Sequence, residues 1–369
     1  MIMKPVLVKE LLQFLDDYAP FQLQEGYDNS GLLVGDPQMP VNGVLVTLDC
    51  TVQVVEEAIA QGANVVVAHH PILFKPLKSL TGNGYAEKAI LKAIKNDIAL
   101  IAVHTNLDHV SHGVNSAIAD RLGLINRSIL APLQGNLLKL VTYVPVDQAG
   151  AVLDALHEAG AGEIGNYSHC SFRSEGTGSF MPGENANPYQ GRKNILEQAR
   201  EERLEVIVPA HLEQKVLKAL KDSHPYEEVA YYLHATLNRN QETGAGLVGN
   251  LPEPMESLIF INKVKELFNC KSVRHTDICH KEVKKVALCG GSGSFLTKKA
   301  ISAGADIFIS ADFKYHDFFD ANDRIIIADI GHYESEQFTK ELLTGVLSKK
   351  FPTFAVTFSK LVTNPLSYL

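Results

Sequence analysis

The sequence predicts an α/β protein made of two pseudo-symmetric α/β halves that face one cleft, with a small ferredoxin-like α+β domain inserted between them. Short, continuous apolar runs such as residues 65–68 alternate with amphipathic segments, which is typical of buried parallel strands joined by helices. The same order of elements recurs near the C-terminus, and the middle of the chain changes to half-buried, alternating strands. We therefore expect three parts, residues 1–134, 135–240 and 241–369.

The first half opens with an amphipathic helix within residues 1–20, where charged side chains interrupt the apolar ones too often for a signal peptide. The expected strands are residues 30–36, 44–49, 65–70 and 98–103, and the expected helices are residues 52–61 and 86–95. Thr51 is a suitable N-cap for the first of these helices, and Gly62 a suitable end.

The last third of the chain repeats this order. Segments 246–250, 286–289, 304–310 and 324–331 match, in turn, the glycine-flanked first strand and the three buried strands that follow it. The closing strand of each half runs into a histidine, His104 or His332, and a carboxylate follows four residues later, Asp108 or Glu336. This shared spacing favours a real internal repeat over the general likeness of all α/β units.

The middle segment has the element order βαββαβ, which is that of a ferredoxin-like sandwich. The expected strands are residues 138–144, 167–172, 204–208 and 228–237, and the expected helices are residues 147–159 and 211–222. Residues 174–192 are rich in Gly, Ser, Asn and Pro and lack periodicity, so we expect an exposed loop there.

Composition narrows the class of protein. The chain has 369 residues, 46% of them hydrophobic, and its five cysteines form no CxxC pair, as in a reduced cytoplasmic protein. A formal net charge of -8 without a strong Lys/Arg cluster disfavours nucleic acid as a partner. No apolar window is long enough to cross a bilayer, so we expect no membrane association.

Two adjacent histidines, His69 and His70, end the buried strand at residues 65–70. Ligands bind at the carboxyl ends of strands in open α/β sheets, and neutral imidazoles are good ligands for transition metals. An isolated pair of this kind is as often a capping or packing pair, so the metal interpretation needs partner ligands. His332 and Glu336 are such partners if a helix has begun by Tyr333, although Glu336 could instead be solvated and His332 only a cap.

Together the candidate ligands supply three imidazoles and two carboxylates. They are His69, His70, Asp108, His332 and Glu336. This set is large enough for two divalent ions with an open position for water, and paired metals make a shared water more acidic and more nucleophilic. Imidazole and carboxylate ligands suit zinc, which we place first, and also manganese, iron or cobalt.

Several motifs resemble those of the NGG-interacting-factor family, also labelled GTP cyclohydrolase I type 2 homologues. The motifs are residues 28–35, 68–74, 104–108 and 332–336, and residues 178–184 and 224–228 are similar to those of long bacterial members with a middle domain like PII or CutA proteins. The family often has Trp where this chain has Tyr27.

The resemblance implies a dinuclear metal site with the five ligands above, a GTP cyclohydrolase activity, and a toroidal homohexamer in which the insert helps assembly. It places His104 near the metals, where we expect a catalytic role in proton transfer from outside the ligand set, with structural packing as the alternative.

A glycine-rich turn follows the strand at residues 286–289. Its residues Gly291, Ser292, Gly293 and Ser294 could bind a substrate phosphate through backbone amides, or could form a tight turn with Ser294 as N-cap. We hold the two interpretations equal.

Two functions from different classes remain. The preferred one is a metal-dependent hydrolase of a nucleotide-like or otherwise phosphorylated small molecule. The alternative is a ring-shaped, metal-binding scaffold or regulator without catalysis, because no hydrolytic step requires a complete inserted domain.

Overall fold

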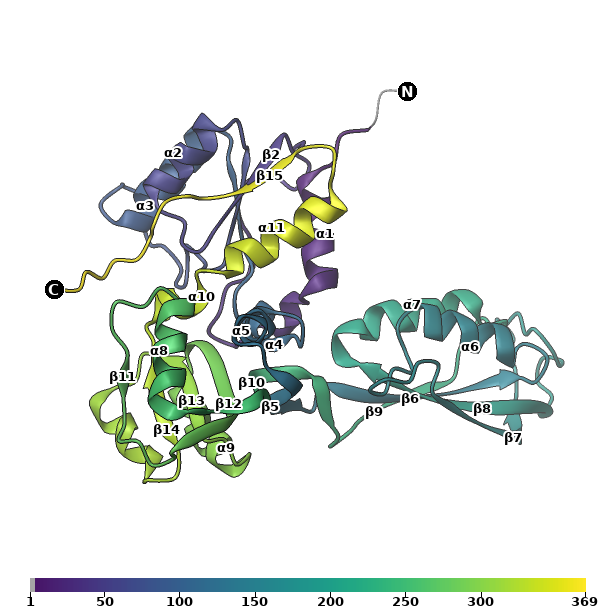
Figure 1. Cartoon of the computed structure of the whole chain (residues 1–369). Coiled ribbons are helices and arrows are strands. Elements are labelled where there is room, and N and C mark those ends of the chain that lie inside the picture. The colour runs from purple at the N-terminus through teal and green to yellow at the C-terminus, as the bar shows by residue number, and fades with distance from the viewer. Residues whose placement is uncertain (1–3) are drawn as a thin grey trace. The chain divides into compact units, whose positions relative to one another are not determined.

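Residues 4–369 are described by the computed structural model, and they form two units, each with its own core. Unit 1 comprises Met1–Ala131 and Thr243–Leu369, and unit 2 comprises Pro132–Glu242. Figure 1 shows the helices and strands of both units. The inserted segment is therefore continuous, whereas the surrounding unit is built from both ends of the chain.

The first sheet of unit 1 has the strand order β1-β4-β3-β2-β15. Its strands are β1 (Gly31–Val34), β2 (Gly43–Thr47), β3 (Val65–Ala68), β4 (Ala99–Ala102) and β15 (Ala355–Phe358). All neighbours run parallel except β1, which is antiparallel to β4. Helices α2 (Val52–Ala60) and α3 (Tyr85–Lys95) pack on the strands through buried side chains such as Val55 and Ile90. Their amphipathic pattern thus places apolar faces on a fully buried sheet.

The second sheet has the order β11-β14-β13-β12-β10-β5. Its strands are β5 (Ile125–Gln134), β10 (Arg239–Glu256), β11 (Arg274–His275), β12 (Glu282–Ser292), β13 (Ile307–Ala311) and β14 (Ile326–Asp329). Strands β12, β13 and β14 are parallel, and β11 and β10 flank them as antiparallel neighbours. Phe308 and Ile327 are buried in its core together with Ala300 of α9 (Thr297–Ser302).

The other α-helices of unit 1 are α1 (Val8–Tyr18), α4 (Thr105–His109), α5 (Val114–Leu122), α8 (Ser257–Leu267), α10 (His332–Glu336) and α11 (Thr339–Lys350). Its short 3-10 helices are η1 (Phe21–Leu23), η3 (Ser294–Leu296) and η4 (Tyr315–Ala321). Helix α10 packs against β12 and β13, and α11 packs against β2 and β15.

The predicted repeat is present, with one difference in which strand matches β1. The order β1-β4-β3-β2 in one sheet corresponds to β11-β14-β13-β12 in the other. Residues 246–250, which we expected to match β1, lie in β10 and pair with β12 at the other side of the parallel strands. Strand β1 and residues 246–250 of β10 each pair antiparallel with an outer member of a set of parallel strands. The glycines that flank such a strand do not specify the side of the parallel strands on which it pairs.

The two halves also exchange strands. The late strand β15 joins the first sheet beside β2, and β5, from residues before the insert, joins the second sheet beside β10. Our expected segments 1–134 and 241–369 therefore each contribute to both sheets. This exchange ties the sheets into one unit and holds their edges in a fixed relation.

Unit 2 is a four-stranded antiparallel sheet with the order β7-β8-β6-β9. Its elements are β6 (Leu137–Pro145), α6 (Ala149–Glu158), β7 (Ser171–Phe180), β8 (Glu197–Pro209), η2 (Ala210–Leu212), α7 (Glu213–Ser223) and β9 (Tyr231–Ala235). Both α-helices cover one face of the sheet (Figure 1), and residues such as Leu140, Val152 and Leu220 fill the space between them. The predicted ferredoxin-like insert is confirmed.

One part of the expected loop at residues 174–192 is a strand. Ser171–Phe180 forms β7, which pairs with β8 along its whole length, and only the residues after it form a loop. Most side chains of β7 are exposed, because it is an edge strand on a sheet with an open face. Without a buried face, the strand lacks the alternation of apolar and polar residues from which a strand is predicted.

In the described part of the chain, no helix combines the length and the apolar character that crossing a bilayer requires.

The core of unit 2 should be sufficient for independent folding. We expect Pro132–Glu242 expressed alone to unfold cooperatively, and Leu140→Ala, at a position 0% exposed, to lower its free energy of unfolding by roughly 2–5 kcal/mol. Leu237 is 94% exposed, so Leu237→Ala should change that energy by less than about 0.5 kcal/mol. Chemical denaturation followed by circular dichroism measures both values, and equal effects would contradict this description of the core.

Candidate metal centre

The parallel strands of both sheets end at the candidate ligands. His69 and His70 directly follow β3, and α10, which carries His332 and Glu336, begins shortly after β14. Gly331 makes the entry into α10 possible, because its φ is 90° and a Cβ there would lie 2.3 Å from Glu334 Oε2. The backbone therefore delivers two pairs of ligands from the carboxyl ends of strands, as the sequence predicts.

One group of ligand atoms consists of two imidazole nitrogens and a carboxylate oxygen. Glu336 Oε2 lies 3.0 Å from His70 Nε2 and 3.0 Å from His332 Nε2. The two nitrogens are 3.3 Å apart. The three residues thus form a group that could hold a metal ion.

A second group lies on the other side of the Glu336 carboxylate. His69 Nε2 is 3.7 Å from Asp108 Oδ1 and 3.8 Å from Glu336 Oε1. His69 Nε2 and Asp108 Oδ1 are both buried and have no hydrogen-bond partner. Buried polar atoms are almost always paired, so two such atoms facing each other need a shared partner.

The distances in the first group, and those from His69 Nε2 to Asp108 and Glu336, match the distances between ligands of one ion. Two ligands at about 2.1 Å from a metal and at a tetrahedral angle are about 3.4 Å apart. The separations of 3.0 to 3.8 Å bracket that value. The residues present therefore fit metal binding, with the Glu336 carboxylate facing both groups.

Each imidazole is oriented by an acceptor on its other nitrogen. The pairs are His69 Nδ1 with Val103 O at 2.9 Å, His70 Nδ1 with Asp49 Oδ1 at 2.7 Å, and His332 Nδ1 with Asp312 Oδ2 at 2.7 Å. This arrangement fixes the ring orientation and leaves Nε2 available to a ligand, as in metal-binding histidines. We did not predict Asp49 or Asp312 from the sequence. Asp49 lies two residues after the end of β2, and Asp312 directly follows β13, so their positions at strand ends were the available signal.

The carboxylates and imidazoles strongly shift one another's pKa. Burial alone would lower the pKa of His70, but hydrogen bonds to Asp49 and Glu336 outweigh it and raise the pKa to about 9. Burial is likewise outweighed at His332, where Glu336 and Asp312 raise the pKa to about 11. Burial raises the pKa of Asp108 to about 7, and the Glu336 charge adds to this effect. The centre is a dense, buried cluster of interacting charges, as expected at a functional site.

His104 lies beside this centre and is held by a buried aspartate. Its Nδ1 is 2.8 Å from Asp28 Oδ1, and Asp28 also accepts a short hydrogen bond from the Thr105 hydroxyl. These bonds outweigh burial and lower the pKa of Asp28. The ring centroids of His104 and His69 are 5.2 Å apart, and the nitrogens of His69, His70 and His104 form a further group that could hold a metal ion. Nδ1 of His104 is therefore engaged by Asp28. Nε2 is available either to carry a proton or to bind a metal ion.

The glycine-rich turn is partly occupied by contacts within the chain. Strand β12 runs through Ser292, and the backbone N–H of Gly291 donates to Ser335 Oγ at 2.9 Å. A Cβ on Gly291 would lie 2.3 Å from Glu336 Oε1, so this glycine allows the backbone to pass close to the carboxylate. Ser294 begins η3 as its first residue, with Gly293 at the N-cap position. A phosphate-binding role for Ser292, Gly293 and Ser294 stays a prediction.

A cleft of about 410 Å³ opens on the centre. His70, His104, Asp108, His332 and Glu336 line it together with the aromatic rings of Tyr27, Phe74, Tyr85 and Phe295. None of its described lining residues is Lys or Arg. We did not predict this aromatic rim from the sequence, because exposed rings on separate loops have no common spacing.

Comparison with known proteins agrees with the fold and the motifs. The family model described as Duf34/NIF3 (NGG1p interacting factor 3) matches residues 6–365. A Staphylococcus epidermidis protein named GTP cyclohydrolase 1 type 2 homolog is 37% identical over 365 residues, covering 98% of this chain and 99% of the relative. A Halalkalibacterium halodurans protein of the same name is 39% identical over 364 residues, covering 97% of this chain and 98% of the relative.

Solved structures show the same relationship. A Bacillus cereus protein related to NIF3 superposes with a TM-score of 0.87 at 39% identity, and Staphylococcus aureus protein SA1388 with a TM-score of 0.79 at 34% identity. Each match covers 100% of both chains. The chain therefore belongs to the Duf34/NIF3 family, whose resemblance the motifs around the candidate ligands had indicated.

Proposed function

We propose that this protein is a hydrolase that depends on two divalent metal ions and acts on a small molecule bound in the cleft of unit 1. The observation that carries the proposal is the pair of buried atoms without hydrogen-bond partners, His69 Nε2 and Asp108 Oδ1, beside the Glu336 carboxylate. Each unpaired buried polar group costs about 1–3 kcal/mol, and one ion in contact with both atoms would remove that cost.

The ligand assignment follows from the two groups. His69 and Asp108 would hold one ion, His70 and His332 the other, and Glu336 would contact both. Bound divalent ions supply Lewis acidity and lower the pKa of water to near neutrality, with zinc, manganese, iron and cobalt all suited to these ligands. Asp49 and Asp312 hold the rings of His70 and His332 in place.

His104 would carry a proton between the reacting water and the substrate. Its Nδ1 is engaged by Asp28, so Nε2 is the nitrogen that can exchange a proton in the cleft. Asp28 acts as a positioning residue, because its carboxylate accepts the hydrogen bond from Nδ1 and fixes the orientation of the ring.

The lining of the cleft favours a substrate that contains a planar ring, which the protein would recognise. Tyr27, Phe74 and Tyr85 at its rim offer faces and edges for stacking. A nucleotide-like substrate meets this requirement, and the relatives' name, GTP cyclohydrolase 1 type 2 homolog, points in the same direction. Any phosphate of that substrate would contact the ions or backbone amides, since no described Lys or Arg lines the cleft.

Metal content and turnover test the proposal together. We expect wild-type protein to retain about two equivalents of divalent metal, and Asp108→Asn and His332→Ala each to lose roughly one, because each removes a ligand from a different group. Elemental analysis measures the metal, and a panel of purine nucleotides assayed for formate and phosphate release measures turnover. Glu253→Gln, at an exposed position in unit 1, is the control and should change neither.

The outcomes separate the proposal from its rival. Turnover that survives chelation of the metal would contradict a metal-dependent hydrolase. Full metal content with no hydrolysis of any compound in a wider screen of phosphorylated metabolites would favour the metal-binding scaffold.

His104→Gln should separate proton transfer from metal binding. We expect turnover to fall by about 10²–10⁴-fold with metal content unchanged, because glutamine keeps hydrogen-bonding capacity but cannot carry a proton. Asp28→Asn should produce a smaller loss and shift the pH profile of turnover. Loss of metal in His104→Gln would instead identify His104 as a ligand.

We also propose a homohexamer, on the grounds of family membership. Sedimentation velocity should give six times the chain mass of 40.4 kDa. A monomer or dimer across the physiological concentration range would contradict this assembly.

A further inference from the structure

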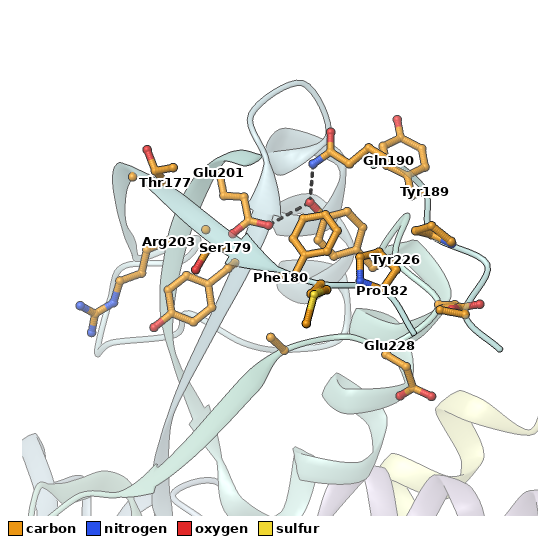
Figure 2. A pocket seen from close by; sticks show the side chains of 18 of the residues that line it. Thr177, Ser179, Phe180, Pro182, Tyr189, Gln190, Glu201, Arg203, Tyr226 and Glu228 are labelled. Atoms are coloured by element: carbon orange, nitrogen blue, oxygen red, sulfur yellow. Dashed lines mark hydrogen bonds between the residues drawn. The ribbon is translucent and has the colours of Figure 1, made fainter. Parts of the chain in front are cut away.

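Unit 2 contains a pocket of about 660 Å³ that the metal centre does not explain. Its lining residues come mainly from β7, β8, the loop that follows β7 and the residues before β9, and Figure 2 shows many of their side chains. Its size falls within the range of about 300–1,000 Å³ that is typical of small-molecule sites. All its lining residues belong to unit 2, so it is a property of the inserted domain alone.

Aromatic rings form one wall of this pocket. The ring centroid of Tyr226 lies 6.3 Å from that of Phe180 and 6.0 Å from that of Tyr189. Tyr143 and Tyr232 form a second pair with centroids 6.3 Å apart. Clustered rings of this kind offer apolar contact area and negative ring faces, which attract cations.

A buried carboxylate stands at the aromatic wall. Glu201 is 8% exposed and accepts a hydrogen bond from Tyr226 Oη at 2.9 Å, while Tyr226 Oη accepts one from Gln190 Nε2 at 2.9 Å (Figure 2). Burial, and after it the neighbouring carboxylate of Glu201, raise the pKa of Tyr226, so its hydroxyl keeps its proton and remains a donor. The hydrogen bond from Tyr226 therefore holds the Glu201 carboxylate in place through Oε1. This bond does not neutralise the negative charge of the carboxylate, as a cation would.

A glycine makes room for this carboxylate. A Cβ on Gly178 would lie 2.2 Å from Glu201 Oε2, so only glycine on β7 lets the side chain lie across the strand in its present position. Replacing Gly178 by alanine should therefore displace the Glu201 carboxylate without removing its charge.

The charge of the lining is negative after existing ion pairs are counted. Glu175 pairs with Arg200 at 2.5 Å, and Arg203 pairs with Glu205 at 2.6 Å. Figure 2 places the Arg203 guanidinium on the opposite side of the view from Gln190 and Tyr189. Three further carboxylates line the pocket, and none has a salt bridge among residues 4–369; they are Glu201, Glu227 and Glu228.

We propose that this pocket is a binding site for a small organic cation, an ammonium group carried on an apolar or aromatic body. The cationic group would lie at the Glu201 carboxylate, and the body would pack on the rings of Phe180, Tyr189 and Tyr226. A buried carboxylate without a cation, next to ring faces, matches both parts of such a ligand. An anionic metabolite would meet the same carboxylates with repulsion.

Three probes that share one body and differ in charge test the proposal on the full-length protein. They are 2-phenylethylamine as the cation, 2-phenylethanol as the neutral compound and phenylacetate as the anion. We expect calorimetry and saturation-transfer NMR to rank their affinities in that order. Phenylacetate binding as tightly as the amine, or no amine binding at millimolar concentration, would overturn the proposal.

Variants locate the binding site. Glu201→Gln should weaken amine binding roughly tenfold, since it removes the charge but keeps an acceptor for Tyr226. Gly178→Ala should also weaken it by moving the carboxylate, and it serves if Glu201→Gln fails to fold. Glu158→Gln, at an exposed position at the end of α6, should leave the affinity unchanged.

Two results would show that the amine binds at another site or that the pocket has another role. Amine binding that is unaffected by both Glu201→Gln and Gly178→Ala would place the amine at another site. If these variants changed the sedimentation coefficient while no amine bound, the pocket would be an interface between copies of the chain. Either result would overturn the proposal.

Discussion

The buried carboxylate of Glu336 is the constraint on which the rest of unit 1 depends. Its side chain is 3% exposed and lies against His70, which is 266 residues earlier in the chain. A buried charge is tolerated only with close partners, so the chain must bring cationic groups to it from both sheets. His70 and His332 do this in the protein alone, and their own pKa values rise in response. In the same arrangement the Nε2 atoms of His70 and His332 face one another, 3.3 Å apart. Together with the Glu336 carboxylate they form a cluster that could bind a divalent ion.

Such precision requires a rigid connection between the two sheets. A metal centre tolerates displacements of only about 0.5 Å in its ligands, and short helices on loops do not provide that by themselves. The exchange of β15 and β5 between the sheets supplies the connection, because each sheet then contains strands from both ends of unit 1. Helix α10 is further held by contacts with β12 and β13, where Gly291 allows the backbone to approach Glu336.

Much of this architecture could be predicted, since it depends on local patterns. The runs around β3 and β13 are apolar without alternation, and His69 and His332 follow strands closely enough to mark the ligand-bearing ends. Relations across the chain could not be predicted in the same way. The exchange of β15 and the edge position of β10 depend on which strands meet in three dimensions, and no local signal specifies that. Strand β7 escaped detection because its exposed residues contribute backbone hydrogen bonds rather than a buried face.

Asp49, Asp312 and Asp28 show a different limit of sequence reasoning. Each accepts a hydrogen bond from an imidazole, yet an aspartate at a strand end or in a loop is common in any α/β protein. Their role becomes visible only when the partner ring is in place.

The composition of the cleft restricts the chemistry further than the ligand set does. Aromatic rings and carboxylates line it, and no described Lys or Arg does, so the metal ions themselves would be its strongest positive charges. A polyanionic substrate could then enter only with its charge at the ions or outside the cleft, whereas a planar ring could stack at the rim without them. Recognition and charge neutralisation would therefore fall to different parts of the site, with the protein selecting the ring and the ions holding the reacting group.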